Sequence, residues 1–460
     1  MEGNTGNTNL GKRRKEGDML KAVFVSIAYF ACLLLLIGVA TPGESSGSGF
    51  NPPAGFILYK STPKNSEWGR AVAIQPDGKI VVMGVSYNGK KHHILVMRFN
   101  SDGTRDNTFG VGGVFIYGEK SKGNNYGSGV ALQPDGKIVV VGDSYYDKSR
   151  EVLVLRCNSD GSLDNTFGKG GVVTYNRSQT KENKDLSFGV MLQSDARIVV
   201  VGSTHNGKNY EPMILRYNSD GSLDSSFGKG GVVTYKGLSN ANGWGRAVAI
   251  QPDGRIVMVG VSYTTKKCDV VTVRYNADGS LDKGFGEGGV ALSTCPPGGR
   301  DWGRSIAIQR DGKIIVAGNT RLRENTNILL LRYNANGKPD TSFGMGGVAS
   351  YQSMVKKGNW GQAVALLTGG KILIVGNSLS GPKKEAYIAR CNSDGTMDRS
   401  FGKEGFVLAN GPPDSNNWGF AITTQPDGKI IVVGYAQSGK NRDMLVARYK
   451  NDGTPDALQN

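Results

Sequence analysis

The sequence predicts an all-β protein, a seven-bladed β-propeller of four-stranded antiparallel blades. Three observations predict this fold. A unit of about 58 residues recurs seven times along the chain. Each complete unit holds four runs rich in valine and isoleucine, separated by glycine, asparagine and aspartate, which is the pattern of strands and turns. The last unit lacks its fourth run, whereas an extra run precedes the first unit.

The repeat is registered on the glutamine of the segment QPDGK or its equivalent. The registered positions are Gln75, Gln133, Gln193, Gln251, Gln309, Leu367 and Gln425. So regular a spacing excludes chance similarity and predicts a single repeat domain over residues 50–460. No segment of this domain shows a helical period, so we expect no helix in it.

The first unit illustrates the four expected strands. One run ends at Gln75, the second starts at Lys79, the third starts at Ile94 and the fourth ends at Tyr117. The first run contains small residues, which suit an innermost strand beside a narrow channel. The second-to-third and fourth-to-first connections then share one face of the ring, and the two repeated turns share the other.

The turn between the first two strands contains Asp77 and Gly78, a pair that predicts a type I′ hairpin because glycine tolerates positive φ. Four other units repeat the Asp-Gly pair. The third unit has Asp195 and Ala196 instead. Alanine resists the left-handed conformation by about 1–2 kcal/mol, so we predict a different turn there.

The ends of the repeat region predict how the sheets are arranged. The segment Phe56–Tyr59 matches the fourth strand of a unit, and this is the strand that the last unit lacks. A closed ring lets Phe56–Tyr59 complete the seventh blade and leaves no large sheet edge. An open stack would leave that strand without a partner and would need polar capping units, which the sequence lacks.

Two segments carry a resemblance to a known family. LQPDGKIVVVG (Leu132–Gly142) and LRYNSDGSLDSSFGKGGVVT (Leu215–Thr234) resemble the delta-60 repeat family, a bacterial β-propeller-type repeat. The resemblance covers most of the chain from Phe50 onward and implies a propeller-like ectodomain. It implies no catalytic residue and no cofactor. Unit six departs from the pattern at Leu367–Gly370, and unit seven lacks the Phe-Gly motif.

The N-terminal part differs in composition from the repeats. Residues 1–21 are basic, residues 22–40 are apolar throughout, and residues 41–49 have the composition of a flexible linker. Nineteen helical residues span about 28 Å, close to the thickness of a bilayer core. The preceding lysines and arginines favour repeats outside the cytoplasm. Residues 22–40 are therefore a transmembrane anchor or a cleaved signal peptide, and the protein is membrane-bound or secreted.

The five cysteines are few for an exported chain of this length. Cys157 and Cys391 follow the arginine of the third strand, where other units have Tyr or Phe, so we expect them to be buried, unpaired packing residues. Cys268 and Cys295 fall in loops of the fourth unit. The sequence leaves open whether these two form a disulfide, because it does not set their distance.

Each unit carries an arginine in its third strand and an aspartate eight residues later. The pairs are Arg98 and Asp106, Arg156 and Asp164, Arg216 and Asp224, Arg274 and Asp282, Arg332 and Asp340, Arg390 and Asp398, and Arg448 and Asp456. Exposed pairs contribute little to stability, whereas breaking a buried pair costs about 3–5 kcal/mol. The constant offset therefore predicts a buried clamp. The alternative is a ring of ligand-binding arginines.

All five tryptophans share one position at the start of the first strand. They are Trp68, Trp244, Trp302, Trp360 and Trp418, with Tyr126 and Leu186 in the remaining units. Two interpretations stay open. The side chains pack between blades, or they form a surface on which sugar rings stack.

Metal and catalytic sites find little support. Asn100, Asp102 and Asp106 have spacings similar to those of a calcium loop, but Asp106 also belongs to an arginine–aspartate pair, so we expect an Asx-stabilised turn. The three histidines, His92, His93 and His205, lie in loops without metal-ligand spacing. No nucleophile elbow or phosphate-binding loop is present. We therefore expect no metal or cofactor and identify no catalytic residue, although carboxylates at a channel mouth remain an enzymatic alternative.

The connections between second and third strands are rich in basic residues. The candidate binding residues are Lys90, Lys91, Lys148, Arg150, Lys208, Lys266, Lys267, Arg321, Arg323, Lys383, Lys384, Lys440 and Arg442. With a net charge of +16, such a rim would attract anionic partners, or it would merely aid solubility.

The sequence favours a binding or scaffold module at the cell envelope. We expect a monomeric ectodomain whose partner is an anionic glycan or an envelope protein, with the membrane contacted through the N-terminal helix. Nucleic acid is not expected as a target of an exported chain. The alternatives are a glycan-degrading enzyme and a purely structural surface protein.

Overall fold

The computed structural model describes residues 55–456 except 63, 178–183, 237–240, 265–266, 294–298, 324, 354–356, 381–382, 410 and 413. The predictions for residues 1–21, 22–40 and 41–49 lie outside this part. Within it, the regular elements are strands, and none of the described segments is a helix long and apolar enough to cross a membrane.

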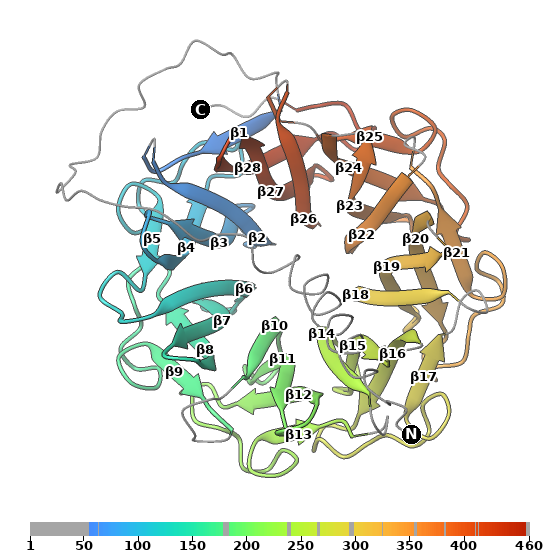
Figure 1. Cartoon of the computed structure of the whole chain (residues 1–460), viewed down its shortest axis with the longest axis horizontal. Helices are drawn as coiled ribbons and strands as arrows, with labels where there is room; N and C mark the ends of the chain where they lie inside the picture. Colours follow the sequence, from blue (N-terminus) through green and yellow to red (C-terminus); the bar gives the residue numbers. More distant parts are fainter. Residues whose placement is uncertain are drawn as a thin grey trace, which may run out of the picture. The chain divides into compact units, whose positions relative to one another are not determined.

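The strands follow a fixed order in each repeat. The strands nearest the centre in Figure 1 are β2 (Ser66–Ile74), β6 (Asn124–Leu132), β10 (Leu186–Leu192), β14 (Asn242–Ile250), β18 (Arg300–Ile308), β22 (Lys357–Leu366) and β26 (Asn416–Thr424). Next to them lie β3 (Ile80–Tyr87), β7 (Ile138–Tyr146), β11 (Ile198–His205), β15 (Ile256–Tyr263), β19 (Ile314–Leu322), β23 (Ile372–Ser380) and β27 (Ile430–Ser438).

The outer half of each repeat is built the same way. The third strands are β4 (His92–Phe99), β8 (Ser149–Cys157), β12 (Tyr210–Tyr217), β16 (Cys268–Tyr275), β20 (Asn325–Tyr333), β24 (Lys383–Cys391) and β28 (Asn441–Tyr449). The fourth strands are β5 (Val114–Tyr117), β9 (Val172–Tyr175), β13 (Val232–Thr234), β17 (Val290–Ser293), β21 (Val348–Tyr351), β25 (Phe406–Leu408) and β1 (Phe56–Tyr59).

Each repeat forms one four-stranded antiparallel unit, which we call a blade. Blade 1 is β2–β5, blades 2 to 6 follow in chain order, and blade 7 is β26–β28 with β1. Blades 4 and 5 are joined into one eight-stranded sheet by a parallel bridge between Cys268 and Arg300. The described residues thus form six sheets that contain seven blades. The predicted all-β, seven-repeat architecture is confirmed.

The prediction for Phe56–Tyr59 is also confirmed. Strand β1 pairs antiparallel with β28, with Phe56 opposite Ala447 and Tyr59 opposite Met444. Alternate side chains of a strand point to opposite faces. Ile57 and Tyr59 therefore pack with residues of blade 1, whereas Phe56 packs with residues of blade 6. One short strand from the start of the domain thus fills the cores on both sides of the last blade.

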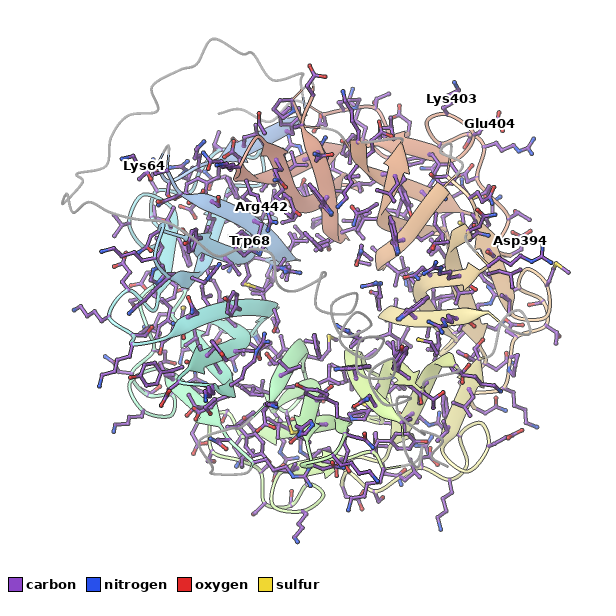
Figure 2. All side chains as sticks on the ribbon, in the orientation of Figure 1. Lys64, Trp68, Asp394, Lys403, Glu404 and Arg442 are labelled. Atoms are coloured by element: carbon purple, nitrogen blue, oxygen red, sulfur yellow. The ribbon has the colours of Figure 1, made fainter. Side chains whose placement is uncertain are left out.

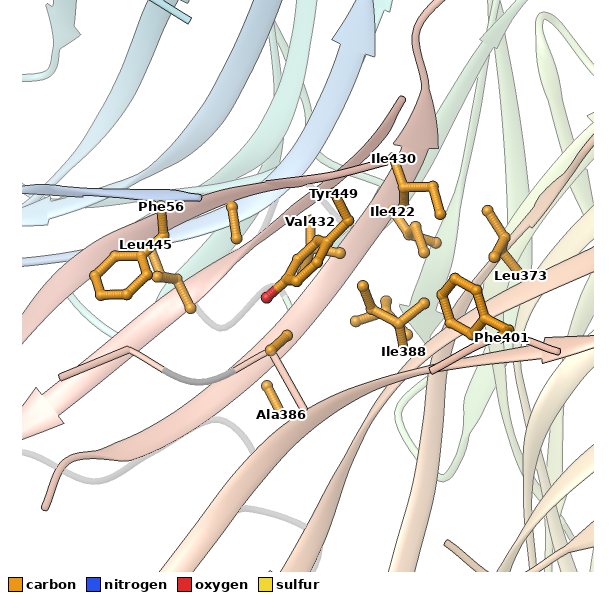
Figure 3. Close-up of a cluster of buried hydrophobic side chains, with 13 residues drawn as sticks. Phe56, Leu373, Ala386, Ile388, Phe401, Ile422, Ile430, Val432, Leu445 and Tyr449 are labelled. Atoms are coloured by element: carbon orange, nitrogen blue, oxygen red, sulfur yellow. The ribbon is translucent and has the colours of Figure 1, made fainter. Parts of the chain in front are cut away.

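The hydrophobic cores lie between neighbouring blades. Figure 3 shows the cluster between blades 6 and 7, where Leu373 and Ile388 face Ile430 and Leu445. All four side chains are fully buried. Completely burying an aliphatic side chain of this size contributes about 1.5–3 kcal/mol, so the interfaces between blades hold most of the apolar stabilisation.

The type I′ prediction for the first turn is wrong. In blade 1 the amide of Gly78 donates to the carbonyl of Gln75, the amide of Gln75 donates to Lys79, and only Gly78 has positive φ. This is a three-residue loop, a type I turn closed by a residue in the left-handed conformation. Pro76 suits the first central position of a type I turn and favours this geometry over type I′.

The prediction of a different turn in the third unit is wrong as well. Ala196 has a φ of 65° and its amide donates to the carbonyl of Gln193, as at the glycine of the other units. The surrounding hydrogen bonds of the hairpin hold alanine in a conformation that costs about 1–2 kcal/mol. Tertiary structure here overrides the local preference.

Candidate functional site

The seven arginine–aspartate pairs lie on the face of the repeated turns. In each pair the arginine Nε lies 2.6–2.7 Å from the aspartate Oδ2. The two members of each pair are eight residues apart in sequence and adjacent in space, because the turn after the third strand folds back onto it. Arg216 and Asp224 are representative, since both side chains are buried.

Each clamp arginine also holds the next blade. Arg98 Nη1 donates to the backbone oxygen of Ser159 in blade 2, and the guanidinium lies 4.8 Å from the centre of the Phe109 ring. The same contact closes the ring, because Arg448 Nη1 of blade 7 donates to Ser101 O of blade 1 at 2.9 Å. The arginines therefore fasten neighbouring blades, a role that spacing within one unit did not reveal.

The electrostatics of the clamp are those of a structural ion pair. Burial would raise the pKa of Asp224, but hydrogen bonds from Ser226 and the charge of Arg216 outweigh it and hold that pKa below its usual value. The ligand-ring interpretation of these arginines is therefore not supported, because their guanidinium groups are committed to protein acceptors.

The calcium-like turn is an Asx-stabilised turn. Asp102 Oδ1 accepts hydrogen bonds from the amide and hydroxyl of Thr104, at 2.9 and 2.7 Å. In the described part of the chain no three His, Cys, Asp or Glu side chains are grouped so that they could hold a metal ion.

The opposite face carries a continuous series of aromatic and cationic side chains, which we call the aromatic–cation arc. It runs over blades 6, 7, 1 and 2 and comprises Lys384, Trp418, Tyr435, Arg442, Trp68, His92, Tyr126 and Arg150.

The contacts within blade 7 and toward blade 1 centre on Arg442. Its guanidinium lies 4.8 Å from the centre of the Tyr435 ring and 5.4 Å from that of Trp68. Trp418 stacks on Tyr435 at 4.5 Å, and Lys384 Nζ lies 4.8 Å from the centre of Trp418. Figure 2 shows Trp68 and Arg442 side by side.

The arc continues into blade 2 through a histidine. The His92 ring lies 5.7 Å from Trp68 edge-on and 4.7 Å from Tyr126. His92 Nδ1 is 3.1 Å from Tyr126 Oη and 3.2 Å from Asn124 Oδ1. Burial lowers the pKa of His92 and raises that of Tyr126. Both shifts favour the uncharged forms of the two side chains.

The tryptophans differ in exposure, so the structure is compatible with both packing between blades and a surface for sugar stacking. Trp68 is buried and packs with Val85 and Tyr435. Trp244, Trp302, Trp360 and Trp418 keep part of their surface exposed. Trp418, with exposed Lys384 over its ring, is the one of these that combines accessibility with a cation.

The structure divides the predicted basic rim. Exposed side chains are Lys90, Lys148, Lys208, Lys267, Arg321, Arg323, Lys383, Lys384 and Lys440, whereas Lys91, Arg150 and Arg442 are half-buried and Lys266 lies outside the described residues. Lys91 donates to Ser121 O, and Arg150 pairs with Asp143 at 2.8 Å. Most of the predicted rim residues are thus exposed, while Lys384, Arg442 and Arg150 lie over aromatic rings.

Hollows elsewhere are less suited to a ligand. A cavity of about 180 Å³ lies between blades 3 and 4, and its lining includes Tyr210 and Asn242. Its volume is smaller than the roughly 300–1,000 Å³ typical of ligand pockets. A larger one, about 630 Å³, opens on the turn face beside Arg390 and Lys371. Both cations are already neutralised by Asp398.

The described cysteines are buried packing residues. Cys157 and Cys391 are fully buried, as expected. Cys268 is a free, buried thiol that donates to the backbone oxygen of Asp301, so it takes no part in a disulfide here. Cys295 lies outside the described residues.

Carboxylates at the centre are few. Within the described innermost strands, Glu67 in blade 1 and Asp301 in blade 5 are the acidic residues, and their blades are not adjacent. A close pair for acid–base catalysis of glycoside cleavage is therefore not formed by these strands.

The fold and both faces together define a β-propeller repeat protein. A sequence profile described as a β-propeller domain of unknown function (DUF5122) matches residues 75–109, 133–167, 193–227, 251–285, 309–343, 370–401 and 425–458. The chain belongs to this family. Among curated protein sequences, none matches the chain.

Solved structures of similar fold include carbohydrate-active enzymes. An ulvan lyase of polysaccharide lyase family PL25 has a TM-score of 0.53 and 12% identity, over 89% of this chain and 97% of that one. Its complex with -[GlcA(1-4)Rha3S]- has a TM-score of 0.52 at the same identity and coverage. A protein of unknown function from Dyadobacter fermentans has a TM-score of 0.46 and 10% identity, over 86% and 98%. At such identities the likeness concerns the fold.

Proposed function

We propose that the protein is an envelope β-propeller that binds acidic polysaccharide through the aromatic–cation arc. The observation that carries this proposal is the alternation of cations and aromatic faces from Lys384 through Trp418 and Arg442 to Tyr126. These side chains come from four blades, and Lys384 is exposed.

The chemistry of the arc fits such a ligand. Aromatic faces pack on the apolar faces of sugar rings, and a guanidinium donates two parallel hydrogen bonds to a carboxylate or sulfate. Cations on aromatic rings are partly desolvated, so each exerts a stronger field than a lysine in water. Neutral sugars would use only the aromatic half of this surface.

The similarity to ulvan lyases supports the same ligand class. The oligosaccharide in the lyase complex contains a uronic acid and a sulfated sugar. A propeller of similar fold in that protein accommodates a chain with both kinds of anionic group, and the arc offers groups complementary to both.

The location of the protein is part of the proposal. The apolar residues 22–40 and the basic residues before them support an anchor or an export signal, with a monomeric ectodomain outside the cytoplasm. We also propose that the repeats are of the delta-60 type. Mass spectrometry of the mature N-terminus separates anchor from signal peptide, because cleavage would remove residues 1–40.

A direct binding experiment tests the function. Full-length protein in non-ionic detergent is titrated with heparin, a uronate-containing sulfated polysaccharide, and with neutral dextran at low and high salt. We expect salt-sensitive binding to heparin and none to dextran, because screening weakens charged contacts. Absence of salt-sensitive binding to heparin and to a polyuronate would count against the proposal.

A glycan-degrading enzyme is the second candidate, and the pair His92 and Tyr126 favours it. A neutral imidazole beside a protonated phenol provides a base and an acid 3.1 Å apart. Beside the cations of the arc, such a pair suits proton abstraction next to a uronate carboxylate. Release of unsaturated uronate, followed by ultraviolet absorbance and lost in His92→Gln, would establish this activity, whereas its absence on polyuronates leaves binding alone.

A further inference from the structure

The innermost strands share an irregularity that the proposed function does not use. In each, the pairing register shifts after the residue that follows the tryptophan position, which leaves one residue bulged. The bulged residues are Arg70, Ser128, Phe188, Arg246, Arg304, Gln362 and Phe420, which we call the bulge ring.

A glycine on the neighbouring strand permits each bulge. A Cβ at Gly260 of β15 would lie 2.1 Å from the carbonyl oxygen of Trp244, so only glycine allows the two strands to approach there. Bulges re-aim side chains and are frequent beside functional sites. Because all seven occur at the same register on strands that surround the centre in Figure 1, the bulged side chains lie at one level.

Contacts within the bulge ring show that its members meet. Arg70 lies over Phe420 of the preceding blade, 4.7 Å from the ring centre. Arg246 lies over Phe188 of the preceding blade at 4.4 Å. Arg304 Nε donates to Asn319 Oδ1 at 3.1 Å. Each arginine is thus oriented by an aromatic face or an amide.

The bulge ring has a net positive charge. It holds three arginines and no acidic residue, and the ion pairs of the described residues include none for Arg70, Arg246 or Arg304. Burial, and next the charge of Arg304, lowers the pKa of Arg246 to about 9, which leaves it protonated at pH 7. Burial likewise lowers the pKa of Arg70 and of Arg304.

A half-buried cation without a counter-charge is costly, and a guanidinium binds oxyanions with two parallel hydrogen bonds. On the turn face, an aspartate neutralises each clamp arginine. Arg246 and Arg304 occupy equivalent bulges on neighbouring blades and form no ion pair among the described residues, so an anion between them would supply the missing counter-charge.

We propose that the bulge ring is an oxyanion-binding site at the centre of the propeller, formed chiefly by Arg246 and Arg304 with Arg70 from the other side. It takes a sulfate or a carboxylate group, either as a free ion or as a substituent of a saccharide. Its chief members, Arg246 and Arg304, lie outside the aromatic–cation arc, although Phe420 of the bulge ring contacts Tyr435 of the arc, and the proposal does not depend on the function proposed for the arc.

Calorimetric titration of the full-length protein with sodium sulfate, at constant ionic strength maintained with sodium chloride, tests the site. We expect saturable binding to the wild-type protein and at least about a ten-fold weaker binding to the double variant Arg246→Gln and Arg304→Gln. The matched control is Lys169→Gln with Lys229→Gln, which removes the same charge from exposed positions on the turn face and is expected to bind as the wild type does.

Two further measurements distinguish a free ion from a saccharide-borne group and check that the variants fold. Glucose 6-sulfate binding more tightly than inorganic sulfate, through the same arginines, identifies a saccharide-borne group, and the reverse order identifies a free ion. Thermal unfolding without sulfate shows whether the double variant folds, and single Arg304→Gln replaces it if not. Equal sulfate affinity of wild type and arginine variants, or no saturable binding to the wild type, would overturn the proposal.

Discussion

Arginines on the two faces of the propeller differ in what lies against them. On the turn face Arg216 contacts the carboxylate of Asp224, a carbonyl of the next blade and the Phe227 ring. On the loop face Arg442 lies over the rings of Trp68 and Tyr435. The carboxylate and carbonyl contacts recur in every blade and the ring contact in blades 1 to 6, whereas the cations over rings of the arc are Lys384, Arg442 and Arg150.

The difference separates cations that maintain the fold from cations that aromatic rings hold on the loop face. A carboxylate neutralises an arginine, so a clamp arginine has little attraction left for an anion. An aromatic face orients a cation without neutralising its positive charge. Repetition around the ring therefore marks the structural face, and local departure from the repeat marks the candidate binding face.

The largest effect is expected from breaking one clamp. Asp224→Ala leaves Arg216 buried without its carboxylate, which should lower the free energy of unfolding by about 3–5 kcal/mol. Denaturant titration followed by tryptophan fluorescence measures it. Replacing both partners, as Arg216→Met with Asp224→Ala, should cost less than the single change.

An exposed ion pair on the same face provides the control. Arg399 and Glu404 lie 3.4 Å apart with most of both side chains exposed, and Figure 2 shows Glu404 near the outer edge. Arg399→Gln should change stability by less than about 0.5 kcal/mol. If Asp224→Ala costs as little as Arg399→Gln, the clamp has no structural role.

A smaller effect is expected in the pH dependence of stability, which should differ between Glu67 and the clamp aspartates. Burial raises the pKa of Glu67, beside Trp68, to about 7, although hydrogen bonds from Ser61 and Ser86 oppose the shift. The raised pKa stabilises the folded state below about pH 4.5, and this contribution is lost as pH rises through 7. Asp224 is shifted in the opposite direction, so its contribution is lost in acid.

The variant Glu67→Gln isolates this contribution. The stability of the wild type relative to Glu67→Gln should fall by roughly 1–3 kcal/mol between pH 5 and pH 8, because over most of this range Glu67 is ionised in the unfolded state but keeps its proton in the folded state. Denaturant titrations at the two pH values measure the difference. A pH-independent difference would show that Glu67 keeps an ordinary pKa.

The smallest effect is expected at the first turn. Ala196→Gly removes a side chain from a residue with a φ of 65° and should stabilise the protein by about 1 kcal/mol. Gly136→Ala is the opposite substitution at the equivalent position, where Gly136 has a φ of 82°. It should destabilise the protein by a similar amount. Thermal unfolding compares the two, and equal signs would contradict the shared turn geometry.

Much of the fold was predictable because it repeats. Four runs per unit and the displaced strand Phe56–Tyr59 predicted the blades and the last pairing. The constant offset from Arg98 to Asp106 indicated that these residues act together. These features depend on local spacing, which a sequence displays directly.

The missed features depend on contacts between units. Nothing near Arg98 in sequence indicates that it reaches Ser159 in the next blade, and the turn at Ala196 follows its neighbours rather than its own preference. Within the arc, Lys384, Arg442, His92 and Arg150 share one position of the third strand, and Trp418, Trp68 and Tyr126 share one position of the first strand. The repeat register therefore offered a signal, but the contacts that join these side chains across blades are visible only in the structure.

The most direct test of the central claim compares cations on the two faces. Heparin affinity is measured at fixed ionic strength for the wild type, for Lys384→Gln with Arg442→Gln, and for Lys169→Gln with Lys229→Gln. The loop-face pair should lose about ten-fold or more in affinity, equivalent to about 1.4 kcal/mol, while the turn-face pair changes little. Equal losses in both variants would mean that net charge alone attracts the polysaccharide and would contradict a binding site on the arc.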